Sequence, residues 1–245
     1  MRKIVCPAFI CCMCALAACD KHDPILPGTR TAIFDTGDVV VMNTTVSGLP
    51  DAATVYENAP CPYRQDSSNV IWDGEKKIFS GFPTSNSVKN DARPVCGDGY
   101  VYAGLTTGEL VKVNPKNRQI AWIADIYKDS NMTGGASVLD IVAPITLDGD
   151  GNVYAGGVGD AFCKLAAKNG KKKWCVNVGT ALPYVMAGPA VFVMATDGNL
   201  YAIRIADGAI YWRTAVKTAA APEYAGGVIT VGREKFRAAT GEKTK

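Results

Sequence analysis

The stretch "GNVYAGGVGDAFCKLAAKNGKKKW", residues 151–174, contains the pattern that decides the fold. It opens with a glycine and a run in which side chains alternate as they do in a β-strand, and a second such run follows after a short turn. The pair Asn169-Gly170 is typical of a tight turn between antiparallel strands, and a third run after it ends on Trp174. The stretch therefore predicts at least three antiparallel strands in succession.

The same pattern occurs three more times along the chain. The other copies are "GYVYAGLTTGELVKVNPKNRQIAW" (99–122), "GPAVFVMATDGNLYAIRIADGAIYW" (188–212) and "GGVITVGREKFRAATGEKTK" (226–245). The first three copies in the chain end on Trp122, Trp174 and Trp212, which are 52 and 38 residues apart. A unit of about 40–50 residues built from short strands is typical of a propeller blade.

The repeated tryptophans have a structural explanation. A sheet whose side chains alternate between two faces cannot bury both faces alone, whereas stacked sheets can. We therefore expect Trp122, Trp174 and Trp212 to pack as large aromatics between neighbouring blades. The alternative is a stacking platform for a cofactor, but recurrence at the same repeat position favours the structural role.

The pattern G-x-V-Y-A, then G-x-L-x-A, then G-x-x-x-W resembles the quinoprotein-type (PQQ-like) β-propeller repeat. The resemblance is good over residues 90–245 and poor over residues 31–89. It implies an all-β propeller of about 4–5 four-stranded blades, fewer than the eight usual in the family. A small ring, a ring closed by a strand from residues 31–89, and an open half are all compatible with this length. Trp72, within residues 66–82, fits the end of one blade and the start of the next.

The first 18 residues have the features of a lipoprotein signal peptide. Arg2 and Lys3 precede 15 uncharged residues, too few for a helix to cross a hydrocarbon core of ~30 Å. The run "LAAC" at 16–19 resembles a lipobox, which implies cleavage before Cys19 and lipidation of its thiol. An ordinary secretory signal or a poorly marked membrane anchor is the alternative. We divide the chain into signal peptide (1–18), lipidated tether (19–30) and propeller domain (31–245).

Composition narrows the classes of function. Without the signal peptide, 24 basic and 23 acidic residues nearly balance, so nothing suggests a nucleic-acid partner. The one dense basic cluster, Lys171–Lys173, is expected at a solvated loop tip. His22 is the only histidine and lies in the tether, which excludes a Ser-His-Asp triad and a histidine-based zinc site in the domain.

Four cysteines remain in the domain after Cys19. If the Asn169-Gly170 turn brings its two strands together, Cys163 and Cys175 lie opposite each other, near enough for a disulfide in an oxidising compartment. Two packed free thiols are the alternative. Cys61 and Cys96 are too far apart in the sequence for the same argument, and their state stays open.

The sequence offers no convincing catalytic or metal site. Asp148, Asp150 and Asn152 have the oxygen spacing of a calcium loop, but the glutamate near the twelfth position is absent, and a metal-free hairpin turn is favoured. Quinone-dependent dehydrogenases of the resembled family use calcium, a carboxylate and basic groups, and no such set converges here. We therefore expect no cofactor and no bound metal.

The segment between the first two repeats, residues 126–144, is longer than a connection between blades requires. Long loops on a rigid scaffold are natural binding elements. The repeat and the lipobox together resemble the assembly lipoproteins of the outer-membrane β-barrel assembly machinery, and that resemblance implies that such a loop docks on the barrel-folding subunit. Asp129 and Asp140 are then candidate partner residues. A surface insertion without a partner is the alternative.

Together, the lipobox and the repeat resemble the assembly lipoproteins of the outer-membrane β-barrel assembly machinery. The resemblance implies a non-enzymatic scaffold that assists the assembly and insertion of outer-membrane β-barrel proteins. Its partners would be the subunits of that machinery and unfolded outer-membrane proteins, and its lipid would anchor it to the periplasmic face of the outer membrane. Asp20 is also compatible with retention in the inner membrane. A quinone-dependent periplasmic dehydrogenase and a ligand-binding propeller lipoprotein are the alternative functions.

Overall fold

The computed structural model describes residues 39–244, except residues 57–58, 86, 89–92 and 128–137. The signal peptide, Cys19, Asp20, the tether and Asp129 lie outside the described residues. Within the described part of the chain, every regular element is a β-strand. No helix there is long and apolar enough to cross a membrane.

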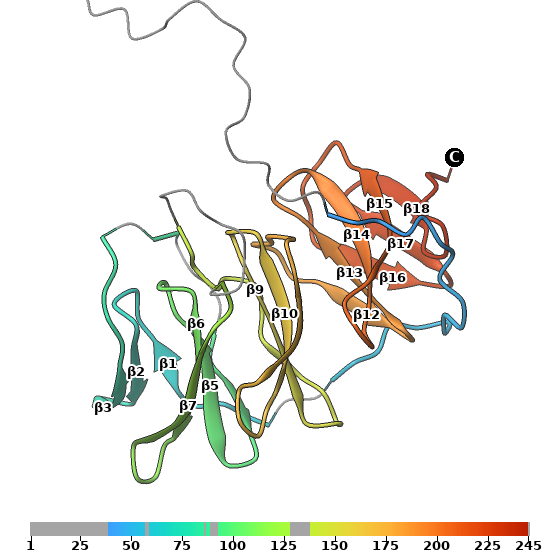
Figure 1. The fold of residues 1–245 in the computed structure, drawn as a ribbon. Helices are drawn as coiled ribbons and strands as arrows, with labels where there is room; N and C mark the ends of the chain where they lie inside the picture. Colours follow the sequence, from blue (N-terminus) through green and yellow to red (C-terminus); the bar gives the residue numbers. More distant parts are fainter. Residues whose placement is uncertain (1–38, 57–58, 86, 89–92, 128–137, 245) are drawn as a thin grey trace, which may run out of the picture. The chain divides into compact units, whose positions relative to one another are not determined.

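The described strands form five antiparallel sheets, and within each sheet consecutive strands are neighbours (Figure 1). Sheet I contains β1 (Arg64–Gln65), β2 (Val70–Asp73) and β3 (Lys76–Ser80). Sheet II contains β4 (Val95–Gly97), β5 (Tyr100–Gly104), β6 (Glu109–Asn114) and β7 (Gln119–Asp125). Sheet III contains β8 (Thr146–Leu147), β9 (Asn152–Gly157), β10 (Ala161–Ala166) and β11 (Lys172–Val176).

The last two sheets complete the series. Sheet IV contains β12 (Val185–Ala187), β13 (Ala190–Met194), β14 (Asn199–Arg204) and β15 (Ile210–Ala215). Sheet V contains β16 (Pro222–Ala225), β17 (Val228–Val231) and β18 (Glu234–Arg237). The expected all-β class and the repetition of antiparallel sheets along the chain are confirmed; sheets II to IV have the expected four strands, and sheets I and V have three among the described residues.

The packing of β13 shows why these strands are apolar throughout. All five of its residues are buried. Val191 and Val193 belong to the core shared with sheet III, whereas Phe192 and Met194 belong to the core shared with sheet V. Alternate side chains therefore enter two different cores, and a strand covered on both faces reads as a continuous apolar run. Each fully buried side chain of this size stabilises the stack by roughly 1.5–3 kcal/mol.

Trp72 does not mark a boundary between blades, contrary to the expectation from residues 66–82. It lies in β2, the middle strand of sheet I, where its register partners are Arg64 of β1 and Lys77 of β3. The two runs around Trp72 are joined by a tight turn with Gly74 at a φ of 57°. They form a hairpin within the same sheet because this turn reverses the chain at once.

The first described residues form no sheet of their own and pair with the outer edge of sheet IV. Val41 makes a parallel bridge to Ile210 of β15. The N–H of Thr44 donates to the carbonyl of Tyr211 at 2.9 Å. This segment, blue in Figure 1, thus follows β15 in the manner of an added strand.

The same segment continues onto sheet V and then back to sheet IV. The N–H of Val46 donates to the carbonyl of Ala239 at 2.9 Å, and the Val46 side chain is buried in the core shared by sheets IV and V. Further on, Thr54 bridges to Met186 of β12. Residues near the start of the described chain therefore complete the packing of its last two sheets.

Candidate partner-binding edge

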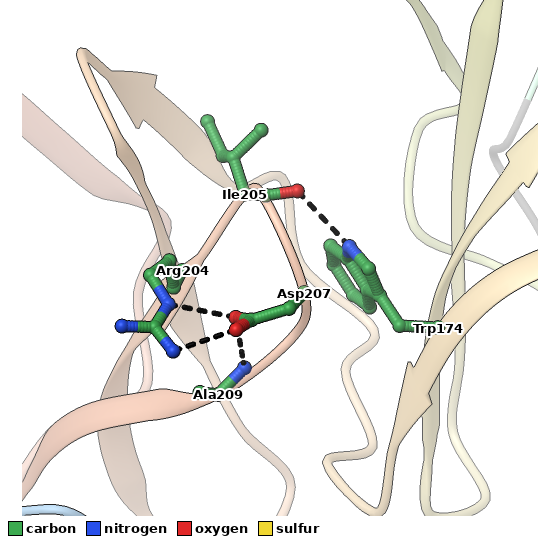
Figure 2. Close-up of polar contacts among 5 residues, drawn as sticks. All are labelled: Trp174, Arg204, Ile205, Asp207 and Ala209. Atoms are coloured by element: carbon green, nitrogen blue, oxygen red, sulfur yellow. Dashed lines mark hydrogen bonds and ion pairs between the residues drawn. The ribbon is translucent and has the colours of Figure 1, made fainter.

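The three repeat tryptophans connect each sheet to the next. Their side chains are buried, and each indole Nε1 donates to a backbone carbonyl in the turn after the third strand of the following sheet. The pairs are Trp122 with Ala167 at 3.0 Å, Trp174 with Ile205 at 3.0 Å and Trp212 with Ala238 at 3.1 Å. Figure 2 shows the second of these contacts. The repeat position thus holds an aromatic side chain that packs between blades and satisfies its own N–H.

A glycine in the receiving turn makes room for each indole. Gly170, Gly208 and Gly241 all have φ between 71° and 80°. An added Cβ would lie 2.6–2.9 Å from the nearest atom of the tryptophan on the preceding sheet. The equivalent residue in sheet II is Arg118, also left-handed at a φ of 60°. Left-handed geometry therefore tolerates a side chain here, and the close approach of an indole explains why glycine occupies the other three turns.

A lysine joins the tryptophan at two of these carbonyls. Lys112 lies directly opposite Trp122 across the β6–β7 pair, and its Nζ also donates to Ala167, at 2.9 Å. Lys164 repeats this arrangement, with a 3.3 Å bond from Nζ to Ile205. Lys112 is only 6 % exposed, and this burial lowers the pKa of its ammonium group.

Two disulfides reinforce the described chain. Cys163 and Cys175 are register partners on β10 and β11, as the turn at Asn169-Gly170 predicted. Sequence analysis left a disulfide and two free thiols open, and the structure has the disulfide. Cys61 is bonded to Cys96 of β4, and the neighbouring Ala59 bridges to the same residue. The second bond fastens the segment before sheet I to sheet II, a contact that sequence spacing did not reveal.

Asp140, a candidate partner residue in the sequence, has an internal position. Its side chain is completely buried, and its Oδ2 accepts the N–H of Val88 at 2.6 Å. Burial raises the pKa of this carboxyl group above its ordinary value. In this position the Asp140 carboxylate is not exposed to a partner; binding by the rest of segment 126–144 stays a prediction.

The "DGDGN" stretch forms a hairpin turn between β8 and β9. Asp148 Oδ1 accepts the N–H groups of Asp150 and Asn152, and Asp148 Oδ2 accepts the Asn152 amide and the Tyr154 hydroxyl. The carboxylate is thus used within the turn. Among the described residues, no group of three or more histidine, cysteine, aspartate or glutamate side chains is placed to hold a metal ion.

The outer strand of sheet II presents an open apolar edge. β7 is the last strand of its sheet, and no described strand pairs with its outer side. Ile120 is 50 % exposed and Ile123 is 44 % exposed. An unpaired strand edge exposes backbone donors and acceptors that can pair with another chain. We call residues 119–125, with these two isoleucines, the β7 edge.

The equivalent edge of sheet IV is already covered. Ile120 and Ile210 both lie two residues before their repeat tryptophan, yet Ile210 is only 3 % exposed. The difference arises because Val41 pairs with Ile210. In sheet III the equivalent residue is Lys172, and charged residues on an edge oppose strand addition. The β7 edge thus resembles the edge of sheet IV in its apolar character, but no described segment covers it.

Sequence analysis did not identify the β7 edge. The signal lies in "QIAWIAD", residues 119–125, which has isoleucine on either side of the repeat tryptophan and no basic residue. The copies at 171–177 and 209–215 have lysine or arginine in this stretch. Only the alignment of the copies makes this difference visible, because apolar residues in a strand otherwise suggest burial.

The chain is similar to one known protein family and to several solved structures. Residues 29–214, and again 163–242, match the family described as outer membrane protein assembly factor BamB. No curated protein matches the sequence.

Similar solved structures have low sequence identity to the chain. BamB from Moraxella catarrhalis is 17 % identical with a TM-score of 0.48, over 64 % of this chain and 49 % of that chain. The computationally designed Ika8 protein is 12 % identical with a TM-score of 0.47, over 73 % and 52 %. Quinohemoprotein alcohol dehydrogenase from Comamonas testosteroni is 14 % identical with a TM-score of 0.46, over 64 % and 34 %. The chain spans about half the length of the first two.

Proposed function

The chain belongs to the family of outer membrane protein assembly factor BamB, and from this membership we propose that it is a non-enzymatic scaffold for outer-membrane β-barrel assembly. In this proposal Cys19 carries the lipid that anchors the protein at the periplasmic face of the outer membrane. The partners are subunits of the β-barrel assembly machinery and unfolded outer-membrane proteins.

The observation that carries the proposal is the β7 edge. Its two isoleucines are exposed, and its outer side is unpaired among the described strands. An extended segment that adds to a sheet edge gains backbone hydrogen bonds, and its alternate side chains contact the neighbouring surface. Unfolded outer-membrane proteins supply such segments, because their strands alternate between apolar and polar residues.

The protein itself contains an example of this mode of binding. Residues 41–44 add to β15, with backbone bonds from Met42 and Thr44 to Ile210 and Tyr211. That segment lies over a residue equivalent to Ile120, so the repeat geometry accommodates an added strand at this position. The same docking on β7 requires a segment from another chain or a part of this chain outside the described residues.

The experiment is a co-purification of the tagged full-length chain from native membranes in mild detergent. We expect the wild-type protein to recover the barrel-folding subunit and unfolded barrel substrates. The double variant Ile120→Lys/Ile123→Lys should lose them, because lysine on an edge opposes strand pairing. Phe82→Lys is the matched control, since Phe82 is 81 % exposed and lies outside the β7 edge.

Three results would count against the proposal. Equal recovery with the β7 variant and the wild type would remove the edge from the interaction. A wild-type preparation without the barrel-folding subunit would remove the assembly function. A stoichiometric quinone absorbance after addition of quinone and calcium would favour the dehydrogenase alternative, and we expect no such absorbance.

A further inference from the structure

Two neighbouring turns expose basic side chains without acidic ones. The β6–β7 turn contains Lys116 and Arg118, and the β10–β11 turn contains Lys168 and Lys171, all four exposed. Residues 110–124 and 161–177 contain no aspartate or glutamate. None of the four makes an ion pair within the described part of the chain. We call these four residues the basic turn patch.

The equivalent turns of the last two sheets neutralise their arginines locally. In the β14–β15 turn, Arg204 Nε and Nη2 donate to the two carboxylate oxygens of Asp207 at 2.7 and 2.6 Å (Figure 2). In the turn after β18, Arg237 pairs with Glu242 at 3.2 Å. The position of Asp207 is taken by an asparagine in the turns of sheets II and III. The uncompensated charge is therefore a local feature of two sheets and does not follow from the repeat.

Packing brings the two basic turns onto one surface. Trp122, four residues after Arg118, packs on Gly170 and donates to Ala167 in the β10–β11 turn. The start of β7 thus lies against the turn that holds Lys168 and Lys171. Like charges gathered in this way repel each other, and an anionic surface relieves that repulsion.

We propose that the basic turn patch binds the surface of an anionic phospholipid bilayer. Clusters of four or more lysines and arginines bind anionic lipid, and each contributes about 1 kcal/mol near the surface. The side chains are at turn tips, from which flexible stems reach a flat array of phosphates. The choice of a bilayer over an acidic protein rests on the lipid anchor of the proposed function, which keeps a membrane within reach. The patch then fixes which face of the domain meets the membrane.

The test uses the chain from residue 20 onward, which lacks the proposed anchor and retains every described residue. It is sedimented with vesicles of phosphatidylcholine alone, or with about a third phosphatidylglycerol, at low and physiological ionic strength. We expect binding only to the anionic vesicles and weaker binding at higher salt. The double variant Lys168→Gln/Lys171→Gln should bind the anionic vesicles about 25-fold more weakly than the wild type, because each lost charge weakens binding about fivefold.

The matched control is Lys76→Gln/Lys235→Gln, which removes the same charge from exposed positions on sheets I and V. It should bind within about twofold of the wild type, since its lysines are outside the patch. Equal losses in the two double variants would overturn the proposal, because they would reflect net charge alone. Binding of a soluble polyglutamate peptide without binding of anionic vesicles would also overturn it. The assembly function is tested separately by co-purification, so either proposal can fail alone.

Discussion

Trp174 and Gly208 belong to neighbouring sheets and are packed so closely that a Cβ at position 208 would lie 2.9 Å from the indole Cδ2. The same indole donates its N–H to Ile205, three residues before Gly208. The turn therefore binds the indole through the Ile205 carbonyl, and Gly208 leaves the space that the ring occupies. This contact fixes the position of sheet III relative to sheet IV.

Gly208→Ala should destabilise the protein more than Gly198→Ala. Both glycines have positive φ, at 80° and 83°, but an added Cβ meets Trp174 only at position 208 and nothing within 4 Å at position 198. We expect a loss of about 1 kcal/mol at position 198 from backbone strain and about 3 kcal/mol at position 208, where overpacking adds to it. Urea unfolding of both variants measures the difference. Equal losses would show that Trp174 moves aside without cost.

Lys112→Met should change how stability depends on alkaline pH. Burial lowers the pKa of Lys112 in the folded state, so between that value and the ordinary value of 10.5 the unfolded state binds more protons. The wild type should therefore gain stability relative to the methionine variant as pH rises toward the ordinary value. The measurement is the unfolding free energy of the wild type minus that of the Lys112→Met variant at each pH in this range. Both proteins contain the same tyrosines, so the effect of tyrosine ionisation cancels in the difference. A constant difference would contradict a buried ammonium group.

Asp140→Asn should stabilise the protein at neutral pH. Burial raises the pKa of the Asp140 carboxyl group in the folded state. The protonated form therefore contributes to the free energy of unfolding in full below the ordinary pKa of 3.8, and this contribution is lost as pH rises through the folded-state pKa. The amide oxygen of asparagine can still accept the Val88 N–H and carries no charge to bury. We expect the variant to exceed the wild type at pH 7 and to match it near pH 3. A variant less stable at pH 7 would mean that the charge itself is needed.

Replacing Cys61 and Cys96 together by serine should cost more stability than replacing Cys163 and Cys175. The first bond closes a loop with a sequence separation of 35 and the second a loop with a separation of 12. In the chain-entropy description these correspond to about 4 and about 3 kcal/mol. Denaturant unfolding of the two double variants gives the comparison. The opposite order would show that local packing of the cross-strand pair outweighs loop entropy.

The repeat was predictable from sequence because its signals are local. Within one copy of the repeat, the alternating runs, the turn and the final tryptophan all lie within about 25 residues of each other. The Asn169-Gly170 turn also predicted that Cys163 faces Cys175. The Cys61–Cys96 bond depends on the path of the chain before sheet I, which no local pattern encodes. Trp72 was misplaced because a strand followed by a turn reads alike within a blade and between blades.

The surfaces were harder to predict for a related reason. Whether an apolar strand residue is exposed depends on what covers the edge of its sheet, as the contrast between Ile120 and Ile210 shows. Asp140 reads as a surface residue because carboxylates are rarely buried, and its contact with Val88 spans 52 positions. Both features depend on segments that are distant in the sequence and meet only in the folded chain.

The hydrogen bond from Val46 to Ala239 can form in a newly made chain only after both residues have been synthesised. The ribosome adds Val46 long before Ala239, so the Val46 N–H lacks this acceptor until most of the described chain has emerged. Pairing between such distant positions is slow to form. Until then Val46, the edge of β15 and the core beneath them are open to proteases and to chaperones. The protein is therefore most vulnerable in the interval before Ala239 has been made and has paired with Val46.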